Sequence, residues 1–404
     1  MLTGKVVVLG VTGGIAAYKA AELVRLLVKQ GASVHVIMTR SAREFIAPLT
    51  FQTLSTNPVH TDLFNLIEEQ EIGHISLADR ADLFIIAPAT ANIIGKLASG
   101  IADDLLTTTV MATRAPVLLA PAMNVNMYGN PIYRDNAERL RGHGYQFVEP
   151  AKGMLACGWE GEGRLQDPAV ICEEAIAVLS RKDLLGERVL VTAGPTREEL
   201  DPVRYISNHS SGKMGYALAR AARRRGAEVV LISGPVCLEP PYGVETVGVT
   251  SADEMREAAL GAFADSSIVI KAAAVADYRP ESRAGAKIKK TDAVLNVKLK
   301  KNPDILAELG RNKGERFIVG FAAETTELVE NAVKKLEQKN LDMVIANDVT
   351  REGAGFTVDT NIVKILYRDG GVEDMPLMDK GKLADLILDR VVEKLVQKRV
   401  CGSK

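Results

Sequence analysis

Short, continuous apolar runs alternate along the chain with longer amphipathic stretches. In the first half, the runs that predict strands cover 5–9, 33–38, 82–86 and 116–119. A long stretch with helical periodicity covers 15–30, and a second predicted helix over 168–179 ends this half. Continuous runs are typical of parallel strands that are covered on both faces. The first half therefore predicts a parallel sheet with helices on both sides.

The same strand, turn and helix pattern begins again near the middle of the chain. The predicted elements are strands at 187–192, 267–271 and 317–320 and helices at 214–225 and 324–339. A polar bridge over 181–186 separates the two patterns. We therefore expect two doubly wound, mostly parallel α/β domains in tandem, Rossmann-like or flavodoxin-like. The first domain would cover 1–186 and the second 187–404.

The composition narrows the class of protein without identifying it. A length of 404 residues is that of two or three domains, and the net charge of −1 makes nucleic-acid and membrane partners unexpected. No apolar run approaches the roughly 18 residues of a membrane-spanning helix, and no leader precedes the first strand, so a cytoplasmic protein is expected. The cysteines and histidines lack the spacing of a disulfide framework or a zinc site. Any metal is expected to arrive with a nucleotide.

A glycine turn follows the first predicted strand. Gly13 and Gly14 place backbone N–H groups at the start of a helix, and Thr39 and Ser41 follow the neighbouring strand. Donors at a helix N-terminus bind phosphate well. The turn lacks the Gly-x-Gly-x-x-Gly pattern, and no acidic residue follows the second strand to hold a ribose. This set therefore suits the single phosphate of a flavin mononucleotide better than a pyrophosphate.

Two later strands of the first half end alike, in a proline, small residues and then polar groups. Their endings are Ala87-Pro88-Ala89-Thr90-Ala91-Asn92 and Ala120-Pro121-Ala122-Met123-Asn124. Ligands of an open parallel sheet bind beyond the carboxyl ends of its strands. The alanines would let a flat ring approach the backbone, and the asparagines would hydrogen-bond its edge. The alternative is that the prolines merely terminate both strands.

Three further side chains of the first half are candidates for chemistry. His74 enters a predicted helix among apolar neighbours, where it is either a functional group or a packing residue. Cys157 lies in a stretch over 153–164 whose glycines and alanines predict a mobile loop. Arg164, at the end of that stretch, either pairs with an anionic substrate group or is an ordinary solvated arginine.

Four motifs of the first half resemble, in this order, those of the flavin-dependent cysteine decarboxylases, and among them the phosphopantothenoylcysteine decarboxylases. The motifs are 13–19, 74–77, the Pro-Ala-Met-Asn ending at Asn124 and the Ala-Cys-Gly around Cys157. The resemblance implies that bound FMN oxidises the substrate thiol, so that the thioaldehyde accepts the electrons released with CO2, and then returns a hydride. It implies His74 as a base or positioning group, Asn124 as a holder of substrate amide or carboxylate, and Cys157 as the final proton donor. The FMN contacts it implies are Gly13, Gly14, Thr39, Ser41, Ala89, Thr90 and Asn92.

The second half opens with a segment that suggests a phosphate-binding loop. If Gly212 and Lys213 belonged to a Walker motif, position 207 would be glycine and position 214 would be serine or threonine. The chain has Ser207 and Met214 there, so this motif is excluded. The polar run 208–211 is expected to cap the next helix or to bind an anion.

Later residues of the second half suit a nucleotide. Small residues over 272–276 follow a buried strand and would allow close approach of a base, on which Phe321 would stack. Lysines recur over 287–301 between strand-like residues, which predicts either a solvated face or an ordered basic hairpin over a phosphate chain. On the last of the predicted helices above, Lys335 and Lys339 face each other with no acid between them. Such a pair costs roughly 0.2–0.5 kcal/mol, and a bound anion would remove this cost.

The second half resembles the phosphopantothenate–cysteine ligases. The matching stretches are 193–196, 201–204, 208–214, 272–278, 287–290, 301–305, 320–325 and 346–349. The resemblance implies that CTP, with Mg²⁺ bridging its phosphates, converts phosphopantothenate into an acyl-cytidylate that the amine of cysteine attacks. Lys287 would neutralise charge at the phosphoryl centre, and Asn208 would hold the acyl-cytidylate. The CTP contacts implied are Ala272, Ala273, Asp277, Lys287, Pro303, Asp304, Ile305, Leu306, Phe321, Lys335 and Lys339.

Together the two halves resemble the fused, bifunctional proteins of coenzyme A biosynthesis. This resemblance implies a homo-oligomer, with trimeric contacts between decarboxylase domains and dimeric contacts between ligase domains. An NAD(P)-dependent oxidoreductase is a second interpretation, which the missing glycine pattern and ribose acid disfavour. A non-catalytic regulatory subunit of the decarboxylase fold is a third, which the presence of His74, Asn124 and Cys157 disfavours.

Overall fold

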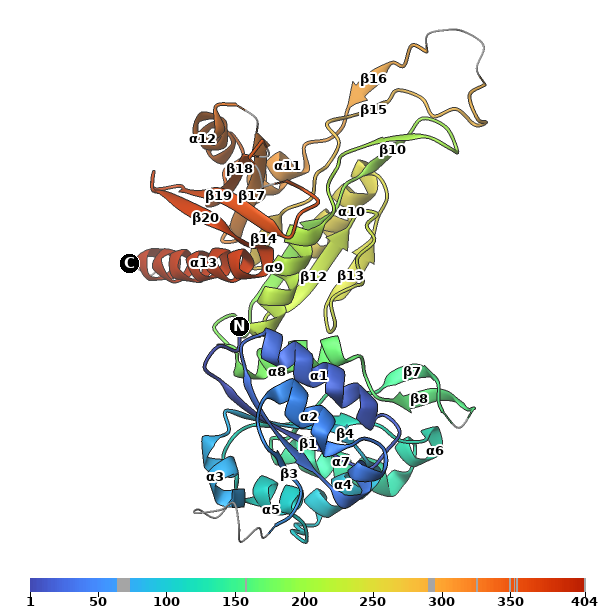
Figure 1. Cartoon of the computed structure of the whole chain (residues 1–404). Helices are drawn as coiled ribbons and strands as arrows, with labels where there is room; N and C mark the ends of the chain where they lie inside the picture. The colour runs from blue at the N-terminus through green and yellow to red at the C-terminus, as the bar shows by residue number, and fades with distance from the viewer. Residues whose placement is uncertain are drawn as a thin grey trace. The chain divides into compact units, whose positions relative to one another are not determined.

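The computed structural model of the chain consists of two compact units, Met1–Ser180 and Arg181–Lys404 (Figure 1). The residues that it describes are 1–63, 73–156, 158–289, 295–324, 326–348, 350–351, 353 and 355–402. The division lies slightly before the expected boundary near Gly186, because Leu184 is buried in the core of the second unit. Each unit is described by itself below.

The first unit is built on a six-stranded parallel sheet in the order β3-β2-β1-β4-β5-β6. Its strands are β1 (Val6–Val11), β2 (Ser33–Met38), β3 (Val59–His60), β4 (Leu83–Ala89), β5 (Val117–Pro121) and β6 (Gln146–Phe147). The strand order reverses between β1 and β4, which is where an open sheet of this kind opens a crevice at its carboxyl edge. The predicted doubly wound fold is confirmed in this unit.

Helices cover both faces of the first sheet. They are α1 (Ala17–Lys29), the 3₁₀ helix η1 (Arg40–Glu44), α2 (Pro48–Ser55), α3 (Gly73–Arg80), α4 (Ala91–Ala98), α5 (Leu105–Ala112), α6 (Val125–Tyr128), α7 (Pro131–Gly142) and α8 (Pro168–Leu179). Val7 and Leu9 of β1 pack toward α1, α2 and α8, whereas Val8, between them, packs toward α3, α4, α5 and α7. This alternation explains why the strands are apolar at every position.

Two sequence predictions for the first unit are wrong in detail. The strands β4 and β5 do not stop before their prolines but continue to Ala89 and Pro121. The stretch predicted as a mobile loop forms an antiparallel hairpin of β7 (Ala151–Met154) and β8 (Glu160–Arg164). Two of its glycines serve close packing, because a Cβ would lie 2.7 Å from the Val125 side chain at Gly161 and 2.3 Å from the carbonyl oxygen of Met123 at Gly163. A high glycine content by itself does not distinguish a closely packed segment from a mobile loop.

The second unit contains an eight-stranded sheet in the order β13-β12-β9-β14-β17-β18-β19-β20. Its strands are β9 (Arg188–Ala193), β12 (Glu228–Ser233), β13 (Glu245–Gly248), β14 (Ile268–Lys271), β17 (Phe317–Glu324), β18 (Met343–Asp348), β19 (Thr360–Tyr367) and β20 (Val372–Asp379). Only β19 and β20 run antiparallel to their neighbours, so the predicted mostly parallel sheet is confirmed. The order reverses between β9 and β14.

The helices of the second unit form two layers around this sheet. They are α9 (Lys213–Arg224), α10 (Ala252–Phe263), α11 (Ile305–Arg311), α12 (Leu328–Gln338) and α13 (Lys380–Gly402). α9 and α13 share one core with the sheet, and α10, α11 and α12 share the other. The predicted helix over 324–339 is therefore too long, because Glu324 still belongs to β17. Phe321, expected just beyond a strand, lies inside β17.

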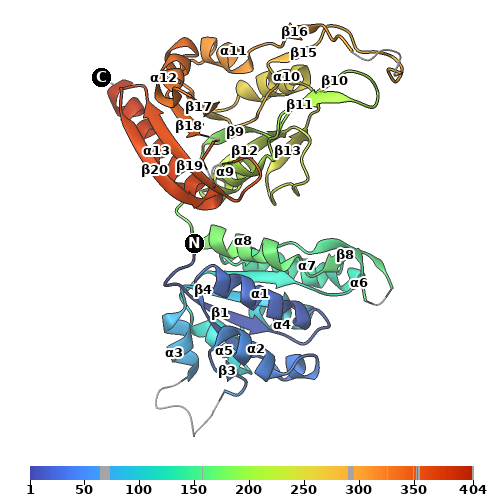
Figure 2. The same cartoon turned by 45° about the horizontal axis from the view of Figure 1, so that its top comes forward.

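Two small antiparallel ribbons extend from one end of the second unit (Figures 1 and 2). They pair β10 (Arg197–Glu199) with β11 (Tyr205–Ser207) and β15 (Tyr278–Pro280) with β16 (Leu299–Lys301). The lysine-rich segment joins β15 to β16, so an ordered hairpin base is confirmed, while Lys290 lies outside the described residues. In the described part of the chain, no helix combines the length and the apolar character needed to cross a membrane.

Candidate active sites

A cavity of about 1150 Å³ lies at the carboxyl ends of the first sheet's strands. The predicted residues that line it are Gly13, Gly14, Thr39, Ser41, Thr90, Asn92 and Asn124. Ala89 does not line the cavity, because it is buried as the last residue of β4. Cys157 lies outside the described residues, although its neighbours Leu155 and Ala156 line the cavity.

The glycine turn is held against η1 and the end of β4. A Cβ at Gly13 would lie 2.3 Å from the Cβ of Ser41, so only glycine lets the two segments approach this closely. Thr12 donates to the carbonyl oxygen of Pro88 at 2.6 Å, which fixes the turn across the reversal of strand order. The turn and the start of η1 therefore form one rigid wall of the cavity.

Asn124 is oriented by the backbone that follows it. Its Oδ1 accepts a hydrogen bond from the amide of Asn126 at 2.8 Å and so caps α6. This bond fixes the amide plane at the edge of the cavity, where a substrate group would meet it.

Two cationic side chains of the first cavity could bind anionic groups of a ligand. Lys19, on α1, and Arg164, at the end of β8, both line it. Burial lowers the pKa of Lys19, and the charge of Arg164 lowers it further, against the opposite effects of Asp167 and Glu22. Arg164 is a sequence-predicted candidate, whereas Lys19 is not, because a single lysine in the first turns of a helix has no distinguishing pattern.

His74 is not brought into this cavity. It lies in the first turn of α3, and its Nδ1 is buried without a hydrogen-bond partner among the described residues. His74 does not belong to the set of predicted residues that line the first cavity. The structure thus unites Asn124 with the glycine turn but places His74 elsewhere.

A second cavity of about 840 Å³ lies at the carboxyl ends of β14 and β17. It is lined by Asn208, Ala272, Ala273, Asp277, Pro303, Asp304, Ile305, Leu306, Phe321, Lys335 and Lys339. These are all of the predicted nucleotide contacts except Lys287, together with the predicted holder of the intermediate. Asn208 donates through Nδ2 to the carbonyl oxygen of Ala274 at 2.9 Å, which orients its amide at the strand end.

Lys287 is exposed and does not line the cavity, but the residue after it is anchored. The buried carboxylate of Asp201 accepts hydrogen bonds from the amides of Val203, Arg204 and Ile288 at 2.7, 2.8 and 3.1 Å. Burial acts to raise the pKa of Asp201, but these backbone hydrogen bonds outweigh it and lower the pKa overall. The described part of the lysine-rich segment is therefore tied to the β10–β11 ribbon at Ile288.

Two predictions about charged and polar groups of this cavity need correction. Lys335 and Lys339 are not left without compensation, because Lys339 pairs with Asp304 at 2.9 Å and Lys335 donates to the carbonyl oxygen of Phe321 at 2.7 Å. The acid comes from the start of α11, which the spacing along α12 does not reveal. The run 208–211 does not cap α9 through a side chain, since the N-cap is Gly212 in a left-handed conformation. The run lines the cavity instead.

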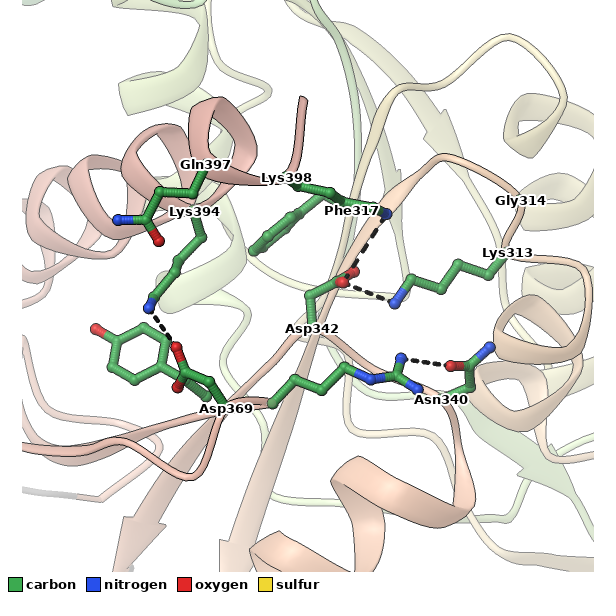
Figure 3. Close-up of a pocket in the computed structure, with 11 residues that line it drawn as sticks. Lys313, Gly314, Phe317, Asn340, Asp342, Asp369, Lys394, Gln397 and Lys398 are labelled. Atoms are coloured by element: carbon green, nitrogen blue, oxygen red, sulfur yellow. Dashed lines mark hydrogen bonds and ion pairs between the residues drawn. The ribbon is translucent and has the colours of Figure 1, made fainter. Parts of the chain in front are cut away.

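A third, smaller cavity of about 520 Å³ lies at the opposite end of the second sheet (Figure 3). Lys313 and Lys398 converge there on Asp342, at 2.7 and 4.0 Å, and Lys394 pairs with Asp369 at 2.6 Å. These pairs attach the end of α13 to the sheet. Among the residues described, no three His, Cys, Asp or Glu side chains gather as a metal site.

The two units match two known families. Residues 1–180 match the flavoprotein family, and residues 184–395 match the DNA/pantothenate metabolism flavoprotein C-terminal domain. The coenzyme A biosynthesis bifunctional protein CoaBC of Bacillus subtilis (strain 168) is 52% identical over 395 residues, 97% of either chain. That of Escherichia coli (strain K12) is 47% identical over 402 residues, 98% of this chain and 99% of its own.

A solved structure of the C-terminal domain of a coenzyme A biosynthesis bifunctional protein CoaBC is 44% identical, with a TM-score of 0.47, and covers 54% of this chain and 99% of that one. The identities to the two bacterial proteins extend over nearly the full length of both partners. The chain belongs to the family of bifunctional coenzyme A biosynthesis proteins, CoaBC.

Proposed function

We propose that the two units catalyse consecutive reactions. The second unit couples 4′-phosphopantothenate to L-cysteine at the expense of CTP, and the first unit decarboxylates the product to 4′-phosphopantetheine with FMN. The observation that carries the proposal is the second cavity, which collects the predicted nucleotide contacts from β14, α11, β17 and α12. Family membership over the full chain supports it.

In the ligase reaction, the residues of the second cavity activate a carboxylate that has no good leaving group. Transfer of CMP to this carboxylate, with loss of pyrophosphate, gives an acyl-cytidylate that Asn208 holds and cysteine attacks. Mg²⁺ arriving with CTP would neutralise negative charge on its phosphates. We assign Lys287 to the phosphoryl centre although it does not line the cavity, because Asp201 anchors its segment through Ile288.

In the decarboxylase reaction, the first cavity fits a flavin mononucleotide. The turn at Gly13, the start of η1 and Thr90 offer donors to one phosphate, and the small residues at the ends of β4 and β5 leave room for a flat ring. FMN supplies the oxidation of the substrate thiol and the returning hydride. Asn124 orients the substrate, Lys19 and Arg164 bind its anionic groups, and Cys157 donates the last proton.

His74 serves the first cavity of a neighbouring copy of the chain. Beside it, Ile75 on α3 and Met111 on α5 are 40% and 56% exposed, and Ile15 and Tyr18 at the cavity are both 59% exposed. Exposed apolar side chains of this size indicate a surface that a partner covers. Because the two surfaces differ, their contact is heterologous, and the proposed assembly is the closed ring that such a contact forms when its rotation closes.

The experiment that tests both reactions uses the purified full chain. Pyrophosphate release should require CTP and phosphopantothenate together, and CO2 release should begin only after cysteine is added. The protein should be yellow with flavin absorption. Pyrophosphate release without phosphopantothenate, or binding of reduced nicotinamide in place of flavin, would contradict the proposal.

Mixed oligomers test the placement of His74. His74→Asn and Cys157→Ser should each fail to form the reduced product. Co-refolding them should restore roughly a quarter of the wild-type rate, the chance that random mixing joins two intact residues at one site. A mixture that stays inactive would place both residues in one copy.

A further inference from the structure

Lys271 is the last residue of β14, one of the central strands of the second sheet. It lies in register with Thr192 of β9 and Gly320 of β17, and it lines the second cavity. Side chains alternate between the faces of a strand, so Lys271 shares a face with Val269. Val269 packs in the core that α11 and α12 cover, and the lysine therefore extends this face at its carboxyl edge.

The charged groups around Lys271 come from three elements. Lys335 and Lys339 approach from α12, Asp304 from the start of α11, and Asp277 from the segment after β14. The carboxylate of Asp304 already pairs with Lys339, and Lys335 donates to a backbone carbonyl. Among the described residues, no hydrogen bond or ion pair involves the Lys271 ammonium group.

Without a bound anion, the positive charge of Lys271 is unfavourable in this cavity. Burial lowers the pKa of Lys271 to about 8, and the charges of Lys335 and Lys339 act in the same direction, against Asp304 and Asp277. The lysines in Figure 3 differ in this respect, because Lys313, Lys394 and Lys398 each have a carboxylate partner. A cation in a cavity is retained at low cost only where a counter-charge reaches it.

We propose that the Lys271 ammonium group binds an anionic oxygen of the nucleotide's phosphate chain, and that the site takes up a proton when the nucleotide binds in mildly alkaline solution. This rests on the proposed nucleotide site. The excess of lysines over carboxylates favours a polyanion such as a triphosphate over a single carboxylate. The contact makes Lys271 a further binding residue of the ligase site.

The proposal is tested by calorimetric titration of CTP and, separately, of cytidine into the full chain. Each titration is run at pH 7, 8 and 9 in two buffers that differ in ionisation enthalpy. For the wild type we expect proton uptake with CTP at pH 8 and 9, none with cytidine, and an affinity for CTP that falls several-fold from pH 7 to pH 9. The sign follows because the phosphate raises the pKa of Lys271 in the complex.

Three variants separate Lys271 from other causes. Lys271→Met should weaken CTP binding by about tenfold at pH 7 and abolish proton uptake. Lys271→Arg, which is charged throughout this range, should keep most of the affinity without the uptake. Lys382→Met, at an exposed position on α13, is the control and should behave like the wild type.

Three results would overturn the proposal in different ways. If the wild type binds CTP without proton uptake and Lys271→Met keeps its affinity, Lys271 does not contact the phosphates, while the ligase function stands. Uptake that persists with cytidine would equally remove the phosphate contact. If the wild type binds no CTP, both the nucleotide site and the role of Lys271 are wrong.

Discussion

The two cavities occupy the same place in two similar sheets, yet their linings differ in kind. In the first unit, β4 is buried along its whole length and ends in Ala87-Pro88-Ala89. In the second, β14 occupies the equivalent position beside the reversal of strand order and ends at Lys271, which Ala272 and Ala273 follow. The sheet supplies a crevice in both, and the residues just beyond the strands decide what it can hold. One lining suits a flat ring with one phosphate and the other a polyanion.

The largest expected effect tests whether the first cavity depends on close backbone packing. In Gly13→Ala, the new Cβ would lie 2.3 Å from the Cβ of Ser41, so the turn must move away from η1. We expect the purified variant to lose its flavin absorption and more than about 100-fold of its decarboxylation rate, because the chemistry belongs to the cofactor. Pyrophosphate release by the second unit should be unchanged.

Gly142→Ala is the matched control, since a Cβ there would meet nothing within 4 Å. It should keep both the flavin spectrum and the rate. A Gly13→Ala variant that binds flavin normally would show that the glycine turn does not shape this site.

The next effect is expected in the second unit alone. Asp201→Ala removes the carboxylate that holds the amide of Ile288, so the segment that carries Lys287 loses its anchor. We expect ligase turnover to fall by about 10- to 100-fold through misplacement of Lys287, with flavin absorption and decarboxylation of added product unchanged. Parallel assays of pyrophosphate and CO2 release in one sample measure this.

Asp265→Ala serves as the control for Asp201→Ala, because Asp265 is an exposed carboxylate of the same unit. Its ligase rate should match that of the wild type. Equal losses in the two variants, or a loss of decarboxylation in either, would remove Asp201 from the positioning of Lys287.

Much of both sites could be predicted because local sequence determines where strands end. Glycines, alanines and prolines after apolar runs located the carboxyl edges of both sheets, and most predicted contacts line the two cavities. The same residue types gave wrong predictions elsewhere. Gly163 was expected in a mobile loop but belongs to a paired hairpin, and Pro88 was expected to end a strand but lies within it. The residue types of a segment show which backbone conformations it can adopt, but they do not show which other segments it packs against.

Contacts between distant segments could not be predicted in this way. Asp304 neutralises Lys339 from another helix, and Asp201 holds Ile288 across 87 positions of sequence. Lys271 was overlooked because one lysine after an apolar run has no periodic signal. The proposed role of Lys271 depends on the charges of Lys335 and Lys339, which the fold brings near it.

The last expected effect concerns the stability of the ligand-free second unit. It tests the contrast between the alanine end of β4 and the lysine end of β14. A lysine whose pKa is 10.5 when unfolded and about 8 when folded destabilises the ligand-free unit most below pH 8, where both states are protonated. Lys271→Met should therefore stabilise the ligand-free protein by at most ~3.5 kcal/mol, at about 1.4 kcal/mol per pKa unit. The melting transition of the second unit should rise at pH 7 by about 2–4 °C for each kcal/mol gained. The gain should shrink by more than about half at pH 9.5, because the folded wild type has by then released the proton. Calorimetric scans of both proteins at the two pH values measure this, and a gain of the same size at both would assign it to packing of the methionine rather than to the removed charge.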